Sequence, residues 1–350
     1  MRPIKRLILH IGLPKTGSSL IQRSLRSIRR PLRRRGFAYI SRGRIRDLAN
    51  YPRGAGGKRP ASPEFVAELR AAVEEEAATE LRRIDSVLIS NEAAAGWPRG
   101  DDPFWPHAAI RIEALIDSIR PASTEIVAYV RRQDRFLESL YMQRIHGGDS
   151  ISWEEFRDKT CDDDRVRYAD LLDSLVSLPT VERMRIRPFE IIAAGAAAFV
   201  GDFLDGIGVG ELVLELEPKT MASANPSYTV PAWQAAMAIN RFVDTEEKRE
   251  EVRRFLREMF PLGEYPKPEL LTETQRMRLI ERYSPHNERL FAKYLPEFPV
   301  DAYSTLEGVS KLEGFLTPIE LPEPPHPEKR RLADRMRAAA AAARREWRDR

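Results

Sequence analysis

Residues 5–19 read KRLILHIGLPKTGSS, and this stretch decides the fold. The apolar run at 7–11 is typical of a strand that is buried on both faces in a parallel sheet. A loop bounded by Gly12 and Gly17, called the glycine loop below, follows the run. A helix is predicted from Ser18, because apolar residues recur after it at helical spacing. The order strand, glycine loop, helix is typical of proteins that bind phosphate groups.

Strand-like runs and helical stretches alternate along much of the chain. This alternation predicts a three-layer α/β/α domain of P-loop type with a central parallel sheet. Beyond Pro218 the pattern is mostly helical, so the C-terminal half is expected to be rich in helices. The predicted strands are 5–11, 37–40, 86–90, 124–130 and 183–187, and the predicted helices include 62–83, 108–119, 134–145, 231–243, 246–260, 272–282 and 285–294.

Composition bounds the organisation of the chain. The 350 residues are 42% hydrophobic and 31% charged, which suits a globular domain. We predict one α/β domain over 1–320 and a proline-rich linker with a basic Ala/Arg-rich tail over 321–350. A net charge of +4 argues against a dedicated nucleic-acid binder. The segment 23–46 holds ten arginines and no acid, either as a solvated helix face or as a field that attracts anions.

Two further features concern the compartment. Cys161 is the one cysteine of the chain, which excludes a disulfide within it and a cysteine-based zinc site. No run approaches 18 apolar residues and the N-terminus does not resemble a secretory signal. We therefore expect a cytoplasmic protein without stable membrane insertion.

The glycine loop carries the groups that an anion site needs. Backbone N–H groups at the start of a helix point outward, and the helix dipole favours negative charge there. Gly12 and Gly17 permit close approach of a ligand to the backbone. Ser18 and Ser19 add hydroxyl donors, and Lys15 adds a full positive charge.

The loop departs from the Walker pattern G-x-x-x-x-G-K-[ST] in one position. Gly12, Gly17 and Ser19 fit it, but Ser18 stands where the pattern has lysine, and Lys15 lies inside the loop. A carboxylate for magnesium is matched only loosely, by the segment 90–92. A P-loop nucleotide kinase is therefore the less favoured alternative.

The segment 12–19 resembles the 5′-phosphosulfate loop of sulfotransferases that use 3′-phosphoadenosine 5′-phosphosulfate (PAPS), whose core is P-K-[ST]-G-[ST]-[ST]. These enzymes read the 3′-phosphate with an Arg at a strand end and a Ser eight residues later. Arg131 and Ser139 match that spacing, while Gln133 stands where the family often has proline. The likeness is greater to bacterial carbohydrate-type members than to the small-phenol branch.

The resemblance implies sulfuryl transfer from PAPS to a hydroxyl or amine of a small-molecule or glycan acceptor, with adenosine 3′,5′-bisphosphate (PAP) as product and no metal. It implies that Lys15 is catalytic, donating to the leaving 5′-phosphate. Arg132 is an alternative to Arg131. The implied nucleotide-binding residues are Gly12, Pro14, Lys15, Thr16, Gly17, Ser18, Ser19, Arg131 and Ser139.

The general base is left open. Glu92 follows a strand at its carboxyl end, where parallel sheets place ligands, and a Glu in a comparable place is the base proposed for carbohydrate sulfotransferases. His10 is expected to be a packed structural residue, and His107 and His146 are weaker candidates for the base. The acidic run 162–164 fits a solvated loop better than a metal site. A catalytically silent nucleotide-binding protein of the same fold is the remaining alternative.

Overall fold

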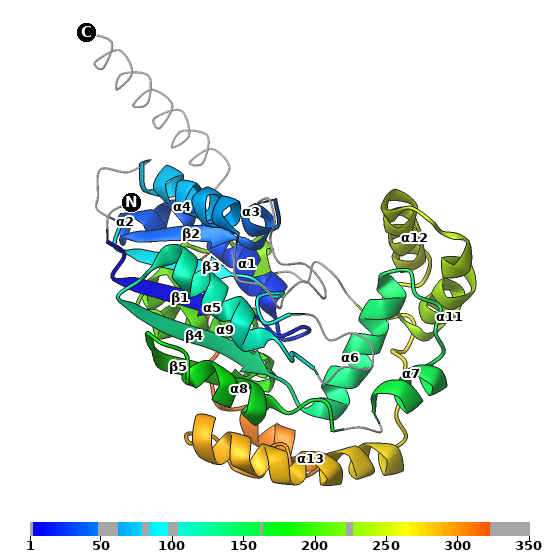
Figure 1. Ribbon diagram of the computed structural model, residues 1–350. Coiled ribbons are helices and arrows are strands. Elements are labelled where there is room, and N and C mark those ends of the chain that lie inside the picture. The colour runs from blue at the N-terminus through cyan, green and yellow to red at the C-terminus, as the bar shows by residue number, and fades with distance from the viewer. Residues whose placement is uncertain are drawn as a thin grey trace.

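A five-stranded parallel sheet forms the centre of the molecule, and its strand order is β2-β3-β1-β4-β5 (Figure 1). The computed structural model describes residues 3–47, 62–78, 84–96, 104–161, 164–221 and 227–322. The strands are β1 (Arg6–His10), β2 (Phe37–Ser41), β3 (Ser86–Ser90), β4 (Ser123–Val130) and β5 (Val181–Pro188). The predicted α/β class with a central parallel sheet is confirmed.

Strand β1 lies between β3 and β4, which explains its unbroken apolar sequence. Leu7, Ile8 and Leu9 are at most 1% exposed, because helices cover both faces of the sheet. The chain leaves β1 toward β2 on one side, and it leaves β4 toward β5 on the other. Ligands of open parallel sheets bind where such connections diverge, outside the carboxyl ends of the strands. The fold therefore points to the loops after β1 and β4.

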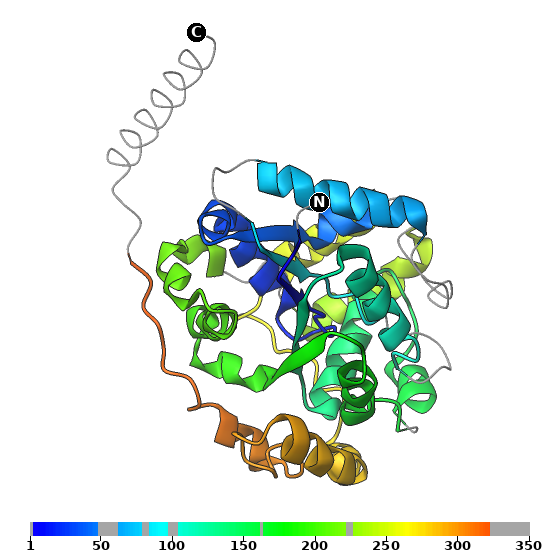
Figure 2. The same ribbon diagram turned by 60° about the vertical axis from the view of Figure 1, so that its left-hand side comes forward.

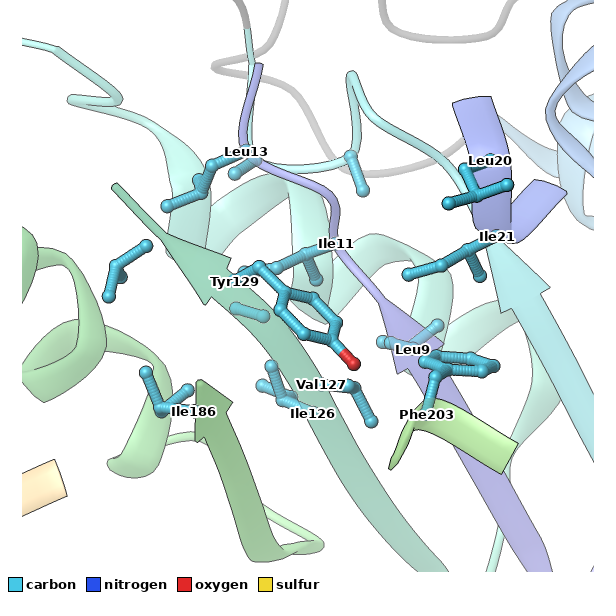
Figure 3. Close-up of a cluster of buried hydrophobic side chains, with 14 of the residues drawn as sticks. Leu9, Ile11, Leu13, Leu20, Ile21, Ile126, Val127, Tyr129, Ile186 and Phe203 are labelled. Carbon is cyan, nitrogen blue, oxygen red and sulfur yellow. The ribbon is translucent and has the colours of Figure 1, made fainter. Parts of the chain in front are cut away.

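Helices pack on both faces of the sheet (Figures 1 and 2). One row contains α4 (Pro63–Ala78), α5 (Ala108–Ile119) and α8 (Tyr168–Val176), and the other contains α1 (Ser18–Ser27) and α9 (Ala196–Gly206). Figure 3 shows the core between β1, β4 and α9, where Leu9, Val127 and Phe203 meet. This core supports the glycine loop from below.

A group of helices stands beyond the carboxyl ends of the strands and is called the helical arm below (Figure 1). It consists of α6 (Gln133–His146), α7 (Trp153–Thr160), α11 (Val230–Ile239) and α12 (Glu246–Met259). The longer helix α13 (Glu273–Tyr294) contacts both α6 and α8. The expected helix-rich C-terminal half is confirmed. The remaining short helices are α2 (Arg29–Arg34), α3 (Arg42–Asp47), α10 (Pro218–Met221), η2 (Phe189–Ala194), η3 (Gly210–Glu215), η4 (Asn240–Phe242) and η5 (Glu307–Leu312).

The prediction of two separate helices at 272–282 and 285–294 is wrong. The structure has one helix, α13, which runs through Pro285. Tyr283 and Asn287, on either side of the proline, are both buried, while Pro285 itself faces solvent. The continuous buried stripe keeps the helix intact, although the proline removes one backbone bond. A capping box closes the start of this helix: the Thr272 hydroxyl accepts from the Gln275 N–H, and the Gln275 side chain accepts from the Thr272 N–H.

The helix predicted from Ser18 is short. It is α1, which ends at Ser27, and Pro31 lies in the first turn of the next helix, α2, where its missing N–H is tolerated. No element was predicted for residues 196–206, which form α9. That helix is buried on most sides, so it lacks the one-sided pattern that reveals surface helices.

Some expectations lie outside the described residues. The basic tail does so from residue 323 onward, and the domain boundary near 320 stays a prediction. In the described ranges, no helix is long and apolar enough to span a bilayer.

Candidate active site

The glycine loop makes a tight turn between β1 and α1. The backbone φ angles of Gly12, Lys15 and Gly17 are +37°, +65° and +81°, in the left-handed region that favours glycine. A Cβ on Gly12 would lie 2.6 Å from Ser18 Oγ, and one on Gly17 would lie 2.8 Å from the Phe199 ring. Both glycines are therefore required by close packing as well as by the turn.

Two predicted ligands of the loop hold its shape. Thr16 is fully buried, and its hydroxyl donates to the Leu13 carbonyl at 2.5 Å. Pro14 is buried as well. These contacts set Lys15 at the tip of the turn, half-buried and in its left-handed conformation. Holding a lysine in this conformation costs on the order of 1 kcal/mol, which the surrounding contacts offset.

The start of α1 meets the requirements of an anion site. Gly17 is the N-cap residue and has no side chain to occupy the first N–H groups of the helix, and the first turn holds no acid. Ser18 is 2% exposed, and its Oγ has no hydrogen-bond partner in the described part of the chain. Ser19 is exposed beside it. A buried hydroxyl without a partner is costly, and an oxyanion in the loop would satisfy it.

Glu92 faces the glycine loop from the end of β3. It is 8% exposed, and Arg42, the first residue of α3, donates to its carboxylate at 2.9 Å. Arg111 from α5 donates to the carbonyls of Ala93 and Ala94, both at 3.2 Å, and so holds the segment that carries Glu92. Burial raises the pKa of Glu92, against the opposing charges of Arg42 and Lys15. Glu92 was predicted because it follows the end of a strand. In the structure this position places it near Lys15.

The electrostatics of Lys15 link three residues into one site. Burial lowers the pKa of its ammonium, the nearby charge of Arg131 lowers that pKa further, and Glu92 opposes both. The two cations lie close together, with Glu92 as the carboxylate that acts on Lys15 and Glu190 as the main opposite charge at Arg131. Such an arrangement is poised to receive a multiply charged anion, because the ligand would relieve the repulsion between Lys15 and Arg131.

The structure separates the two adjacent arginines after β4. Arg131 turns toward the glycine loop, where its Nη1 donates to the Lys15 carbonyl at 3.2 Å and its guanidinium lies 5.0 Å from the centre of the Phe189 ring. Arg132 turns away and is 2% exposed. Its nitrogens bind Asp134 at 2.8 and 3.0 Å, and its Nη1 also donates to the carbonyls of Thr305 and Leu306. Of the two, only Arg131 has its guanidinium at the loop.

These contacts predict a loss of stability for Arg132→Ala. The substitution removes the bidentate partner of Asp134, which is 1% exposed. Arg276 still pairs with Asp134 at 2.6 Å, so we expect a loss of about 3 kcal/mol, at the lower end for a broken buried pair. Arg135→Ala is the matched control: this exposed arginine lies 4.0 Å from the same carboxylate, and its removal is expected to cost about 0.5 kcal/mol or less. Urea unfolding measures both, and equal losses would contradict this assignment.

Ser139 lies on α6, two turns into the helix, and is half-buried. It makes no hydrogen bond within the described ranges, and no contact there joins it to Arg131. Its predicted partnership with Arg131 at a 3′-phosphate therefore stays a prediction.

The histidines differ sharply in their surroundings. His10 is the packed residue that was expected: its Nδ1 lies 2.8 Å from Ser90 Oγ, and burial lowers its pKa to about 3. His107 is the N-cap residue of α5. His146 ends α6, and Lys15 is among the charges that, with burial, lower its pKa to about 3. His146 therefore lies nearer the glycine loop than its place in the sequence suggested.

Other sequence features have structural roles or lie outside the description. Trp105 stacks on Tyr168 with ring centres 5.9 Å apart, as a packing residue would. Asp164 pairs with Arg167 and His286, both at 3.8 Å, while the other two residues of the acidic run lie outside the described residues. Within the described ranges, no three His, Cys, Asp or Glu residues are grouped to hold a metal ion.

A cavity of about 440 Å³ lies at the opposite, amino-terminal edge of the sheet. It is lined by charged residues of β1, β4 and β5, but these are largely paired with one another. Arg6 binds Glu125, and Arg183 lies 3.7 Å from the same carboxylate. The ends of a parallel sheet that bind ligands are the carboxyl ends, so this cavity is not the candidate active site.

Sequence reasoning missed Arg42 and Arg111, the two arginines that position Glu92. Arg42 could have been found, because it lies two residues after the predicted strand at 37–40 and strand ends converge at one edge of the sheet. Arg111 had no such signal, since it lies within a helix far along the chain.

Comparison with known proteins gives structural neighbours only. No family model and no curated protein sequence matches the chain. One similar structure is a sulfotransferase from Alicyclobacillus acidocaldarius, with 14% identity and a TM-score of 0.44 over 87% of this chain and 100% of the other. A second is the sulfotransferase domain from the curacin biosynthetic pathway, with 13% identity and a TM-score of 0.33 over 76% and 99% of the two chains.

Proposed function

We propose that the protein is a PAPS-dependent sulfotransferase that acts on a hydroxyl or amine acceptor, resembling the bacterial carbohydrate-type enzymes. One observation carries the proposal: Lys15 stands inside the glycine loop, where Arg131 donates to its carbonyl at 3.2 Å. The charges of Glu92 and Arg131 both act on the pKa of its ammonium. A Walker-type kinase has its lysine at the position that Ser18 occupies here. The single cysteine, Cys161, is buried and has no second cysteine in the chain to pair with, which fits the proposed cytoplasmic location.

The residues present fit such a donor nucleotide at both charged ends. The N–H groups of Ser18 and Ser19 and the unpartnered Ser18 hydroxyl would hold the 5′-phosphosulfate. Arg131 would hold the 3′-phosphate, because its planar guanidinium matches phosphate oxygens, with Ser139 as its proposed companion. Glu190 holds the backbone next to Arg131 in place, since its carboxylate accepts from the Arg132 backbone N–H at 3.1 Å.

The chemistry divides between two side chains. The donor supplies a sulfuryl group on a phosphate leaving group, so the bond to the acceptor oxygen or nitrogen forms as the bond to the phosphate oxygen breaks. Lys15 neutralises charge that develops on that phosphate oxygen. Glu92 takes the proton that the acceptor loses, and its raised pKa strengthens it as a base while Arg42 keeps it oriented.

Thermal unfolding with nucleotides tests the donor site. PAP at one hundred times its dissociation constant is expected to stabilise the protein by about 2.7 kcal/mol, and so to raise the Tm. ATP with magnesium is the comparison. A shift with ATP and magnesium alone would favour the kinase alternative, whereas conversion of PAPS to PAP with an acceptor panel would exclude a silent nucleotide-binding protein.

Arg131→Ala is expected to abolish selectivity for the 3′-phosphate. One charge-assisted pair contributes about 1.5–3 kcal/mol, so PAP affinity should fall about tenfold to a hundredfold, toward that of adenosine 5′-monophosphate. Titration calorimetry with both nucleotides measures the difference. Arg135→Ala serves as the control, because it removes an arginine of the same helix region whose side chain is exposed. Selectivity that survives in Arg131→Ala would place the 3′-phosphate elsewhere.

A further inference from the structure

One face of α6 carries buried polar atoms that have no hydrogen-bond partner among the residues the structure describes. Ser139, Gln143 and His146 recur at i, i+4 and i+7 and therefore share this face. The Gln143 Oε1 and His146 Nε2 atoms are buried, and neither has a hydrogen-bond partner in the described ranges. Buried polar atoms are normally paired, so this face is built to meet something further.

Helix α12 places three arginines, four residues apart, over the end of α6. Arg249 packs against Gly148, where an added Cβ would lie 2.5 Å from its Nε. Arg253 donates to the His146 carbonyl at 2.8 Å, a normal use of arginine at a helix C-terminus. These two arginines fasten α12 to α6.

Arg257, the third, has no such role. It is half-buried, its Nε is buried without a hydrogen-bond partner, and no ion pair to it occurs among the described residues. Burial lowers the pKa of Arg257, and the ionisable groups that also act on this pKa are Tyr228 and Arg253, of which Arg253 has the same sign of charge. A partly desolvated guanidinium without an acceptor is costly, so it is expected to be compensated by an anion from outside the chain.

Arg257 and His146 also share a neighbourhood with the glycine loop. The His146 ring meets the edge of Tyr228, which is 2% exposed, with ring centres 4.1 Å apart. The charges of Lys15, Arg257 and Arg253 all lower the pKa of His146. The charges of Arg257 and Arg253 also lower the pKa of Tyr228, against the effect of burial. The cluster therefore lies within electrostatic range of Lys15 in the glycine loop, and its charged members are all cations.

We propose that Arg257, together with His146 and Tyr228, binds an anionic group of the acceptor, so that the enzyme prefers acceptors bearing a carboxylate or sulfate beside the hydroxyl or amine. This inference rests on the proposed function. The two charged ends of the donor have their own ligands in the glycine loop and at Arg131. Arg257 lies on α12 of the helical arm, apart from these donor ligands, and is therefore available to the acceptor. A neutral imidazole and a phenol beside it can add hydrogen bonds to the same anion.

Matched acceptor pairs test this subsite. Glucuronate against glucose, and 4-hydroxyphenylacetate against 2-(4-hydroxyphenyl)ethanol, differ in one carboxylate. Calorimetric titration of the PAP-loaded protein measures binding of each probe, and PAP release from PAPS measures kcat/KM. We expect the anionic member to bind more tightly to the wild-type protein, and Arg257→Ala to reduce that preference about tenfold to a hundredfold. Arg257→Lys should restore part of it, because the charge remains but the planar fork is lost.

The controls separate this inference from the proposed function. Arg254→Ala removes an exposed arginine of the same helix and is expected to keep the preference for anions. If PAP raises the Tm of Arg257→Ala as it does for the wild-type protein, the donor site is intact. Failure of PAP to bind the wild-type protein would overturn the proposed function. With PAP bound, equal binding of both members of each pair, binding of neither, or a preference unchanged in Arg257→Ala would overturn the anionic subsite alone.

Discussion

Lys15→Ala is expected to lose sulfuryl transfer while the protein stays folded. Removal of one donor that stabilises developing charge in an active site costs about 10²–10³ in kcat, which corresponds to about 2.7–4 kcal/mol. The backbone of the loop is held by Gly12, Gly17 and the bond from Thr16 to Leu13, none of which depends on the lysine side chain. The turn should therefore persist, and the loss should appear mainly in kcat. Single-turnover conversion of PAPS to PAP measures it.

Lys5→Ala is the matched control for this variant. Lys5 precedes β1 at its amino end, is exposed, and lies 3.8 Å from Asp85. Its removal takes away the same charge from the opposite edge of the sheet and should leave kcat close to that of the wild-type protein. If both variants transferred sulfuryl at the wild-type rate, with the PAP-induced rise in Tm preserved, Lys15 would have no part in the chemistry.

Glu92→Gln is expected to reduce kcat by about 10²–10⁴, the usual contribution of a positioned general base. Glutamine keeps the shape of the side chain and can still accept from Arg42, so the fold should survive the change. Glu75→Gln is a suitable control, because Glu75 is an exposed carboxylate paired with Arg44 at 2.7 Å. A rate for Glu92→Gln equal to that of the control would remove Glu92 from the mechanism and direct attention to His146.

The pH profile of the wild-type protein should report the same two residues. Transfer requires Glu92 without its proton, and burial raises its pKa, so activity should fall on acidification at a higher pH than an ordinary glutamate would give. Transfer also requires Lys15 with its proton, and its pKa is lowered, so activity should fall on the alkaline side earlier than for an ordinary lysine. The acidic limb should disappear in Glu92→Gln. An acidic limb that persists there would belong to another group.

Much of the fold could be predicted because its signals are local. The run at 5–11 is apolar throughout because both faces of β1 are covered, and such a run is visible without knowing what covers it. The caps at Ser152 and Thr272 are local in the same sense, since a capping side chain bonds an N–H three residues away. Pro285 led to the wrong prediction of two helices. A proline normally ends a helix, but the continuous buried stripe of α13 keeps this one intact.

In the candidate active site, too, the features with local signals could be predicted and those that depend on long-range packing could not. By itself, the sequence determined the glycine loop, its lysine and the strand ends that carry Glu92 and Arg131, because the residues of each motif lie within a few positions of one another. Only the tertiary structure decided which of Arg131 and Arg132 faces the loop, that Arg42 holds Glu92, and that Arg257 stands beside His146. Those contacts depend on strand order and on helix packing, which bring together residues far apart in the chain. Arg42 and Glu92 are 50 positions apart, and His146 and Arg257 are 111 positions apart. Contacts of that range arise from the shape of the whole core and leave no periodic trace in the chain.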